Sequence, residues 1–134
     1  MLALEHETAY VCQAIAVNIN FIKQLADELP LYAELDWNTR AITFIQRLQT
    51  CVAKLDEHCQ TLNGEMPDKL TMDVIYIFAY DINSPLAVIR GYCDLIEMSV
   101  PTNDAILIML EAIQAYAADI REIIDELVAA ARTT

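Results

Sequence analysis

The sequence predicts an all-α protein folded as an antiparallel four-helix bundle. Hydrophobic residues make up 56% of the 134 residues and glycine only 2 of them, a composition that favours long helices over a turn-rich β protein. Apolar residues recur at three- and four-residue steps along four long segments, and no segment reads as a strand. Because short connections make consecutive long helices antiparallel neighbours, these segments predict a bundle. The length suits a single domain, residues 1–134.

The first helix is predicted over about residues 2–29, and Pro30 ends it because proline restricts the residue before it. Its inward residues are expected to be Val11, Ala14, Ile15, Phe21, Ile22 and Leu25. Asn38 is the predicted N-cap of the second helix, which runs to about residue 62. Its close heptad-like seam is Ile42, Ile45, Leu48, Val52, Leu55, Cys59 and Leu62.

The strongest break in the chain is "NGEMPDK", which holds an Asn-Gly pair and Pro67, a good first-turn residue. The third helix is predicted over about residues 67–99, and Pro85 inside it is expected to bend it locally. Its inward stripe is Ile75, Phe78, Ile82, Leu86, Ile89, Cys93 and Ile96. The fourth helix is predicted over about residues 101–132, with Ile106, Leu110, Ile113, Ala117, Ile120, Ile124 and Leu127 facing inward.

The second and fourth helices align without a gap when Ile45 is placed over Leu110. The first and third align when Ile15 is placed over Ile89, although an alignment shifted by four residues competes. Since any two amphipathic helices align to some extent, the repeat stays open at this point. If it is real, residues 1–62 and 67–132 are two tandem hairpins. A hairpin cannot bury its apolar face alone, so the two would close one bundle as a pseudo-dimer.

The segment "AYDINSPLAVIRGYCDLIEM" resembles the H-box of sensor histidine kinases, in their dimerisation and histidine-phosphotransfer domain. The family pattern is His, an acid, two variable residues, Thr or Asn, Pro and Leu, followed by an aliphatic run with Ile-x-Gly-Tyr. The matching residues are Asp81, Ser84, Pro85, Leu86, Ile89, Gly91, Tyr92 and Leu95. The resemblance covers about residues 67–132. It implies a four-helix bundle of two hairpins, whose histidine takes phosphate from ATP and passes it to an aspartate on a response-regulator receiver.

This chain departs from the family at the reactive position, where Tyr80 stands in place of the histidine. A phenol is a poor nucleophile at neutral pH, and it offers no second ring nitrogen for Asp81 to orient. Ser84 replaces the Thr or Asn that positions water for phosphatase action in the family. Nothing resembling the family's ATP-binding domain follows, so we expect no autokinase activity.

Three explanations fit this departure. In the first, the chain is a pseudo-phosphotransfer domain that keeps the docking surface but has lost phosphoryl transfer. In the second, the tyrosine was introduced to trap an unphosphorylatable form. In the third, phosphoryl transfer moved to His6-Glu7, the dipeptide aligned with Tyr80-Asp81. Against the last, Val11 occupies the proline position, and His6 lies near a chain end, where helices fray.

The resemblance therefore predicts a module that is not an enzyme and docks a response-regulator receiver or a histidine kinase. The expected contact residues are Tyr80, Asp81, Ile82, Ser84 and Arg90. One alternative is a histidine phosphotransfer protein that uses His6. Another is a helical self-association module without a signalling partner, and the sequence leaves monomer and homodimer open.

The net charge of −12, from 20 acids and 8 bases, argues against nucleic acid and against anionic membranes, both of which require clustered Lys and Arg. No signal peptide and no long apolar run is present. None of the four cysteines forms a C-x-x-C pair, so buried thiols in a reducing compartment are expected. A soluble cytoplasmic protein follows.

No cofactor and no metal is expected, because His58, the histidine within "DEHCQ", lacks convergent ligands. Arg90 and Asp94 are four residues apart on the third helix and are expected to pair.

Overall fold

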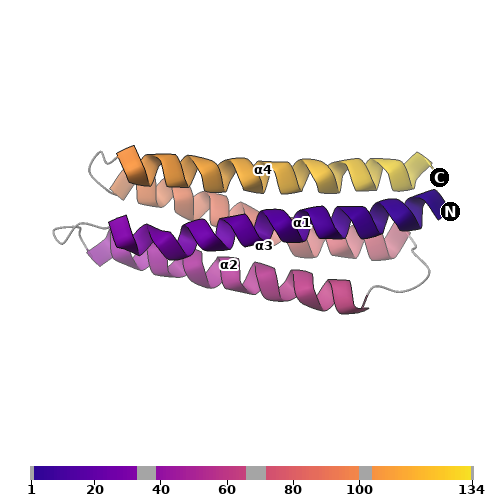
Figure 1. The fold of residues 1–134 in the computed structure, drawn as a ribbon, viewed down its shortest axis with the longest axis horizontal. Coiled ribbons are helices and arrows are strands. Elements are labelled where there is room, and N and C mark those ends of the chain that lie inside the picture. The colour runs from indigo at the N-terminus through magenta and orange to yellow at the C-terminus, as the bar shows by residue number, and fades with distance from the viewer. Residues whose placement is uncertain (1, 33–38, 66–71, 100–103, 134) are drawn as a thin grey trace.

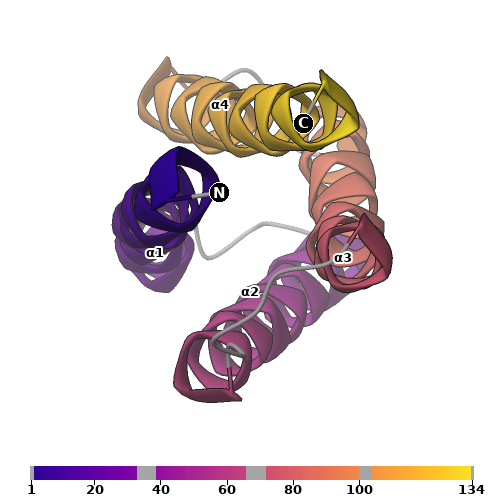
Figure 2. The ribbon, with the colours of Figure 1, turned by 90° about the vertical axis from the view of Figure 1, so that its right-hand side faces the viewer.

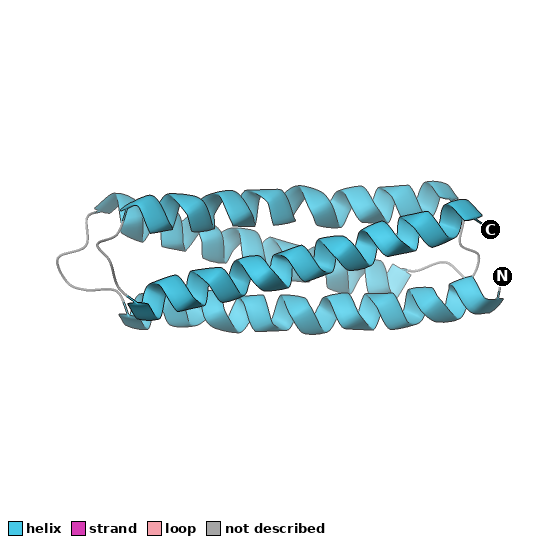
Figure 3. Ribbon diagram, turned by 90° about the horizontal axis from the view of Figure 1, so that it is seen from above, coloured by secondary structure: helices cyan, strands magenta, loops and turns pink. Residues whose placement is uncertain are grey.

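The structure is a computed structural model and describes residues 2–32, 39–65, 72–99 and 104–133. All of them are helical, and the described ranges hold no strand. The elements are α1 (Leu2–Glu28), the short 3₁₀ helix η1 (Leu29–Tyr32), α2 (Thr39–Glu65), α3 (Met72–Ser99) and α4 (Asp104–Thr133). The all-α prediction is confirmed, as Figure 3 shows at a glance.

The four long helices form a bundle in which the chain reverses direction at each connection, so that both termini lie at the same end (Figure 1). Seen end-on, the helices make a ring in which α1 lies between α2 and α4, and α3 also lies between α2 and α4 (Figure 2). In the diagonal pairs, α1 with α3 and α2 with α4, no Cα atoms of the described residues come within 8 Å of each other. Each helix therefore faces its diagonal partner across the core.

One apolar stripe from each helix fills the centre of the bundle. Its members are Cys12, Ile15, Ile19, Ile22, Ala26 and Leu29 from α1 and η1, and Ala41, Ile45, Leu48, Val52, Leu55 and Cys59 from α2. From α3 come Ile75, Ala79, Ile82, Leu86, Ile89, Cys93 and Ile96, and from α4 Ile106, Met109, Leu110, Ile113, Ala117, Ile120, Ile124 and Leu127. Fully burying one such aliphatic side chain contributes about 1.5–3 kcal/mol. The packing of these stripes holds the bundle together.

Two residues predicted to face inward do not. Phe21 is 42% exposed and Ile42 is 41% exposed, because Ile19, Ile22 and Ala41 take the inward positions of their turns. The Phe21 ring instead stacks on Tyr116 of α4, with ring centroids 5.2 Å apart. The side chains of three other predicted inward residues, Val11, Leu62 and Phe78, lie outside the described residues.

Helix ends differ from the prediction at two points. The second helix continues to Glu65 through the Asn-Gly pair that predicted a break, since a single helical glycine costs only about 1 kcal/mol. The first helix ends at Glu28, but the chain continues as η1 with Pro30 inside it. The described part of the fourth helix begins at Asp104, an acid favourably placed near the helix N-terminus. Asn38, residues 67–71 and residues 101–103 lie outside the described residues.

The third helix is continuous over Met72–Ser99 with Pro85 inside it. Because proline has no backbone N–H, the carbonyl oxygen of Asp81, four residues earlier, lacks its helical donor. The local bend expected at this point stays a prediction.

The burial pattern of the two hairpins agrees with the repeat. With Ile45 over Leu110, the pairs buried in both α2 and α4 are Ala41/Ile106, Ile45/Leu110, Leu48/Ile113, Val52/Ala117, Leu55/Ile120 and Cys59/Ile124. With Ile15 over Ile89, the pairs buried in both α1 and α3 are Cys12/Leu86, Ile15/Ile89, Ile19/Cys93 and Ile22/Ile96. The competing alignment would place buried Ile15 over half-buried Pro85. Burial therefore favours the first alignment, which relates α1 to α3 and α2 to α4.

Candidate functional site

The five predicted contact residues lie on α3, and all of them except Ile82 are exposed or half-buried. Tyr80 is 72% exposed, Ser84 is exposed, and Asp81 and Arg90 are half-buried. Ile82 is 0% exposed and belongs to the core. Its prediction as a contact residue is wrong, because successive residues are about 100° apart around a helix, and this turn from Asp81 places Ile82 on the buried stripe.

A groove runs between α3 and α4 beside these residues, with a volume of about 650 Å³. The residues that line it from α3 are Tyr80, Asn83, Ser84, Leu86, Ala87, Arg90, Gly91 and Asp94, and those from α4 are Gln114, Ala117, Arg121 and Asp125. Three predicted contact residues, Tyr80, Ser84 and Arg90, therefore line one hollow; Asp81 does not. We call this hollow the α3/α4 groove.

Two side-chain hydrogen bonds join α3 to α4 in one antiparallel register. At one end of the groove, Nε2 of Gln114 donates to Oδ1 of Asp94 over 3.1 Å. Beyond its other end, Nε of Arg132 donates to the Tyr76 hydroxyl over 2.8 Å, and the guanidinium lies 5.6 Å from the centre of the Tyr76 ring. This register places Ala118 level with Arg90, and Ala87 level with Arg121. The two arginines thus face the middle of the groove from opposite walls, about one helical turn apart.

The middle of the groove is built from small residues, Ala87 and Gly91 on α3 and Ala117 on α4. A Cβ added at Gly91 would meet nothing within 4 Å, and its φ is not positive. Neither packing nor backbone geometry therefore requires glycine here, although glycine inside a helix costs about 1 kcal/mol relative to alanine. Its absent side chain leaves helix backbone open to close approach from outside.

Arg90 and Arg121 form no ion pair with any residue that the structure describes. The one salt bridge among the described residues joins Lys23 to Asp56 at 3.4 Å. The predicted pair of Arg90 with Asp94 is wrong, because Asp94 instead accepts the hydrogen bond from Gln114 across the groove. Two guanidinium groups are therefore left facing the groove without a carboxylate partner in the described part of the chain.

The groove also contains an unsatisfied acceptor. Oδ1 of Asn83 is buried and accepts no hydrogen bond from any described residue. Buried polar atoms are normally hydrogen-bonded, so this oxygen is an exception within the described residues.

Sequence reasoning missed a second apolar stripe on α3. Tyr80 shares it with Ile77, Val88, Leu95 and Met98, all of them exposed, and the small residues Ser84 and Gly91 lie among them. Helical spacing places these residues opposite the buried stripe of the same helix. We call them the α3 outer stripe. The signal was present in the sequence, because these residues recur at the same three- and four-residue steps as the core residues.

The thiols are poor candidates for chemistry. Cys12, Cys59 and Cys93 are buried and Cys51 is half-buried, all unbridged. Burial, followed by the nearby Cys59, raises the pKa of Cys12 to about 11. Burial, followed by the charge of Asp94, raises the pKa of Cys93 to about 12. Because the thiolate is the nucleophile, these thiols are unreactive at neutral pH.

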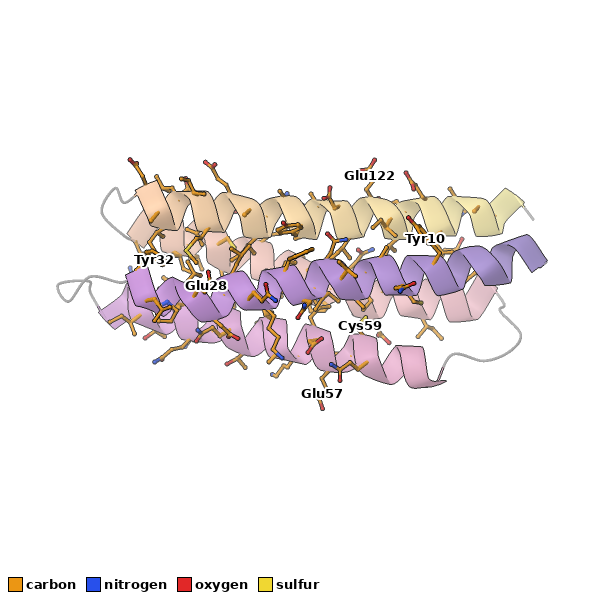
Figure 4. All side chains as sticks on the ribbon, in the orientation of Figure 1. Tyr10, Glu28, Tyr32, Glu57, Cys59 and Glu122 are labelled. Carbon is orange, nitrogen blue, oxygen red and sulfur yellow. The ribbon has the colours of Figure 1, made fainter. Side chains whose placement is uncertain are left out.

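The remaining sequence candidates are scattered. His58 is exposed, and its neighbours diverge, with Glu57 pointing into solvent and Cys59 lying between the helices (Figure 4). No three His, Cys, Asp or Glu side chains of the described residues come together as metal ligands. The side chains of His6 and Glu7 lie outside the described residues.

No family model, curated protein or solved structure matches the chain. In the parts of the chain that the structure describes, every helix is too short or too polar to cross a membrane.

Proposed function

We propose that this protein is a non-catalytic module of two-component signalling, which docks a response-regulator receiver or a histidine kinase on α3. The observation that carries the proposal is the clustering of H-box residues at one open surface that lacks the reactive histidine. Tyr80, Ser84, Arg90 and Gly91 all line the α3/α4 groove.

The surface offers both affinity and specificity. The α3 outer stripe supplies apolar side chains that a partner can cover, and Tyr80, which belongs to both the stripe and the groove, is an aromatic anchor of the kind enriched at binding hot spots. The small residues of the groove allow a partner to approach closely. The arginines, Asp94 and Asp125 give the groove a fixed charge pattern that discriminates between partners.

The same residues support a docking role over a catalytic one. Tyr80 forms no hydrogen bond with any described residue, so no base is in place to take its proton. A tyrosine so placed can contribute contact area to a partner but is not activated for phosphoryl transfer.

The experiment is a binding assay of the purified protein against purified receivers and sensor-kinase phosphotransfer domains from the same source organism. Val88 and Val17 form a matched pair, being 45% and 50% exposed on α3 and α1. Val88→Asp places a charge in the proposed contact and should weaken binding at least tenfold, about 1.4 kcal/mol. Val17→Asp should leave it unchanged. Absence of binding to every domain, or equal losses in the two variants, contradicts the proposal.

A second candidate function, self-association, is favoured by the α3 outer stripe, which a second copy could cover. It is distinguished by oligomeric state. Sedimentation of the wild-type protein alone as a dimer that Val88→Asp converts to a monomer, with no receiver or kinase bound, would replace docking by self-association.

A further inference from the structure

We propose that the α3/α4 groove binds a carboxylate side chain of the docked partner protein, held between Arg90 and Arg121. The inference rests on the proposed function, because it names the chemistry that the partner presents to that same groove.

Arg90 and Arg121 line the groove from opposite walls. They project from α3 and α4 into one hollow, about a helical turn apart along it, and neither has an ion pair among the described residues. Lack of an ion pair does not by itself distinguish them, since Arg40, Arg47 and Lys54 have none among the described residues either. What distinguishes Arg90 and Arg121 is that both line one hollow. A planar guanidinium is well suited to bind a carboxylate through two parallel hydrogen bonds.

The charged residues follow a defined order along the groove, with acids at its ends and arginines between them. In the register of α3 against α4, Asp94 lies at one end beside Gln114, and Asp125 lies level with Asn83 at the other end. The arginines occupy the stretch between them. The complementary partner presents one acidic side chain, with hydrogen-bond donors about one helical turn to either side of it.

The middle of the groove is accessible to a side chain that enters from outside. Ala87, Gly91 and Ala117 surround the arginines, and the space above Gly91 is open. A short acidic side chain can therefore reach both guanidinium groups. A carboxylate carries a single charge, whereas a phosphoryl group brings nearly two toward Asp94 and Asp125. This difference commits the site to an aspartate or glutamate side chain.

The test uses the full chain with arginine side-chain Nε–Hε signals observed by NMR, and sodium acetate as the probe. Arg90 and Arg121 should titrate together, with affinity at least about tenfold above that of Arg40 and Arg47, two exposed arginines of α2. Arg121→Gln should weaken acetate binding at Arg90 at least about fivefold. Arg40→Gln, the matched control, should not change it.

Three results overturn the inference: four arginines that titrate alike, an Arg90 titration unaffected by Arg121→Gln, or inorganic phosphate binding more than tenfold tighter than acetate. The last would identify a phosphoryl group as the ligand. The proposed function fails separately, when no receiver or kinase domain binds the wild-type protein. Partner binding that survives Arg90→Gln with Arg121→Gln would overturn the carboxylate site and leave docking intact.

Discussion

The two hairpins share a buried pattern but differ on their outer surfaces. In the alignment that burial favours, Ala16 of α1 corresponds to Arg90 and Val17 to Gly91, while Asp56 of α2 corresponds to Arg121. The second hairpin therefore has two arginines and an open glycine where the first has none of them. In the first hairpin, Asp56 is engaged across α1 and α2 by Lys23 at 3.4 Å.

The hollows on the two hairpins also differ, both in the helices that line them and in charge. The α3/α4 groove, about 650 Å³, is lined by two helices and includes four charged residues. The hollow found on α1, about 290 Å³, is lined by that helix alone and by no charged residue. Glu57 and its counterpart Glu122 point outward on opposite sides of the bundle (Figure 4). The two hairpins share one pattern of buried residues but differ on their outer surfaces, and for this reason we propose the docking site on the second hairpin.

The largest expected effect tests the shared core. Ile15 and Ile89 are equivalent in the repeat, and both are 0% exposed. Ile15→Ala and Ile89→Ala should each lower the free energy of unfolding by about 2–5 kcal/mol, through lost burial and the cavity left behind. Urea denaturation measures both. If one substitution costs several kcal/mol and the other almost nothing, the two hairpins do not share a core in the way that the alignment requires.

A second effect depends on pH, and in the second hairpin's core it comes from Cys93. Because the pKa of Cys93 is raised from 9.0 to about 12 in the folded protein, the unfolded chain loses this proton first as pH rises. The stabilisation that the protonated Cys93 thiol gives the folded protein is complete below about pH 9 and is lost between about pH 9 and 12. Over this range the free energy of unfolding falls by up to about 1.4 kcal/mol per pH unit.

The measurement is the free energy of unfolding against pH in wild type and Cys93→Ala. The variant should lower overall stability but flatten the decrease above pH 9. Cys51→Ala is the control, because Cys51 is only half-buried, and although burial raises the pKa of its thiol, the charge of Lys54 opposes that rise. Parallel curves for wild type and Cys93→Ala would show that the thiol does not titrate as expected.

The sequence was sufficient to predict the buried stripes of α3 and α4. Burial follows helical periodicity so closely that every described residue of the predicted α3 and α4 stripes is buried. In α1, only Ile15 and Ile22 are buried among the predicted inward residues that the structure describes. Phe21 was misplaced because an apolar residue beside the stripe can pack on a neighbouring helix, and only the position of Tyr116 decides this. Periodicity within one helix holds no information about the helix beside it.

The candidate site was predictable only in part, for a related reason. The motif selected Tyr80, Ser84 and Arg90, all on one helix. Arg121 and Gln114 were missed because their place in the groove depends on the register of α4 against α3, which no motif encodes. Ile82 was wrongly included because neighbours in a motif are separated by about 100° around a helix.

The smallest expected effect, and the one that most sharpens the comparison, is at Gly91. Gly91→Ala should raise the free energy of unfolding by about 0.5–1 kcal/mol, because alanine is the better helix former and its Cβ meets nothing within 4 Å. The same methyl group enters the groove and should weaken partner binding. Val17→Ala, at the equivalent position of α1, should change stability slightly and binding not at all. Urea denaturation and the receiver-binding assay measure the two effects. A less stable Gly91→Ala protein would show that the fold itself requires glycine. A more stable protein that binds its partner less well would mean that helix stability has been given up to keep this groove open.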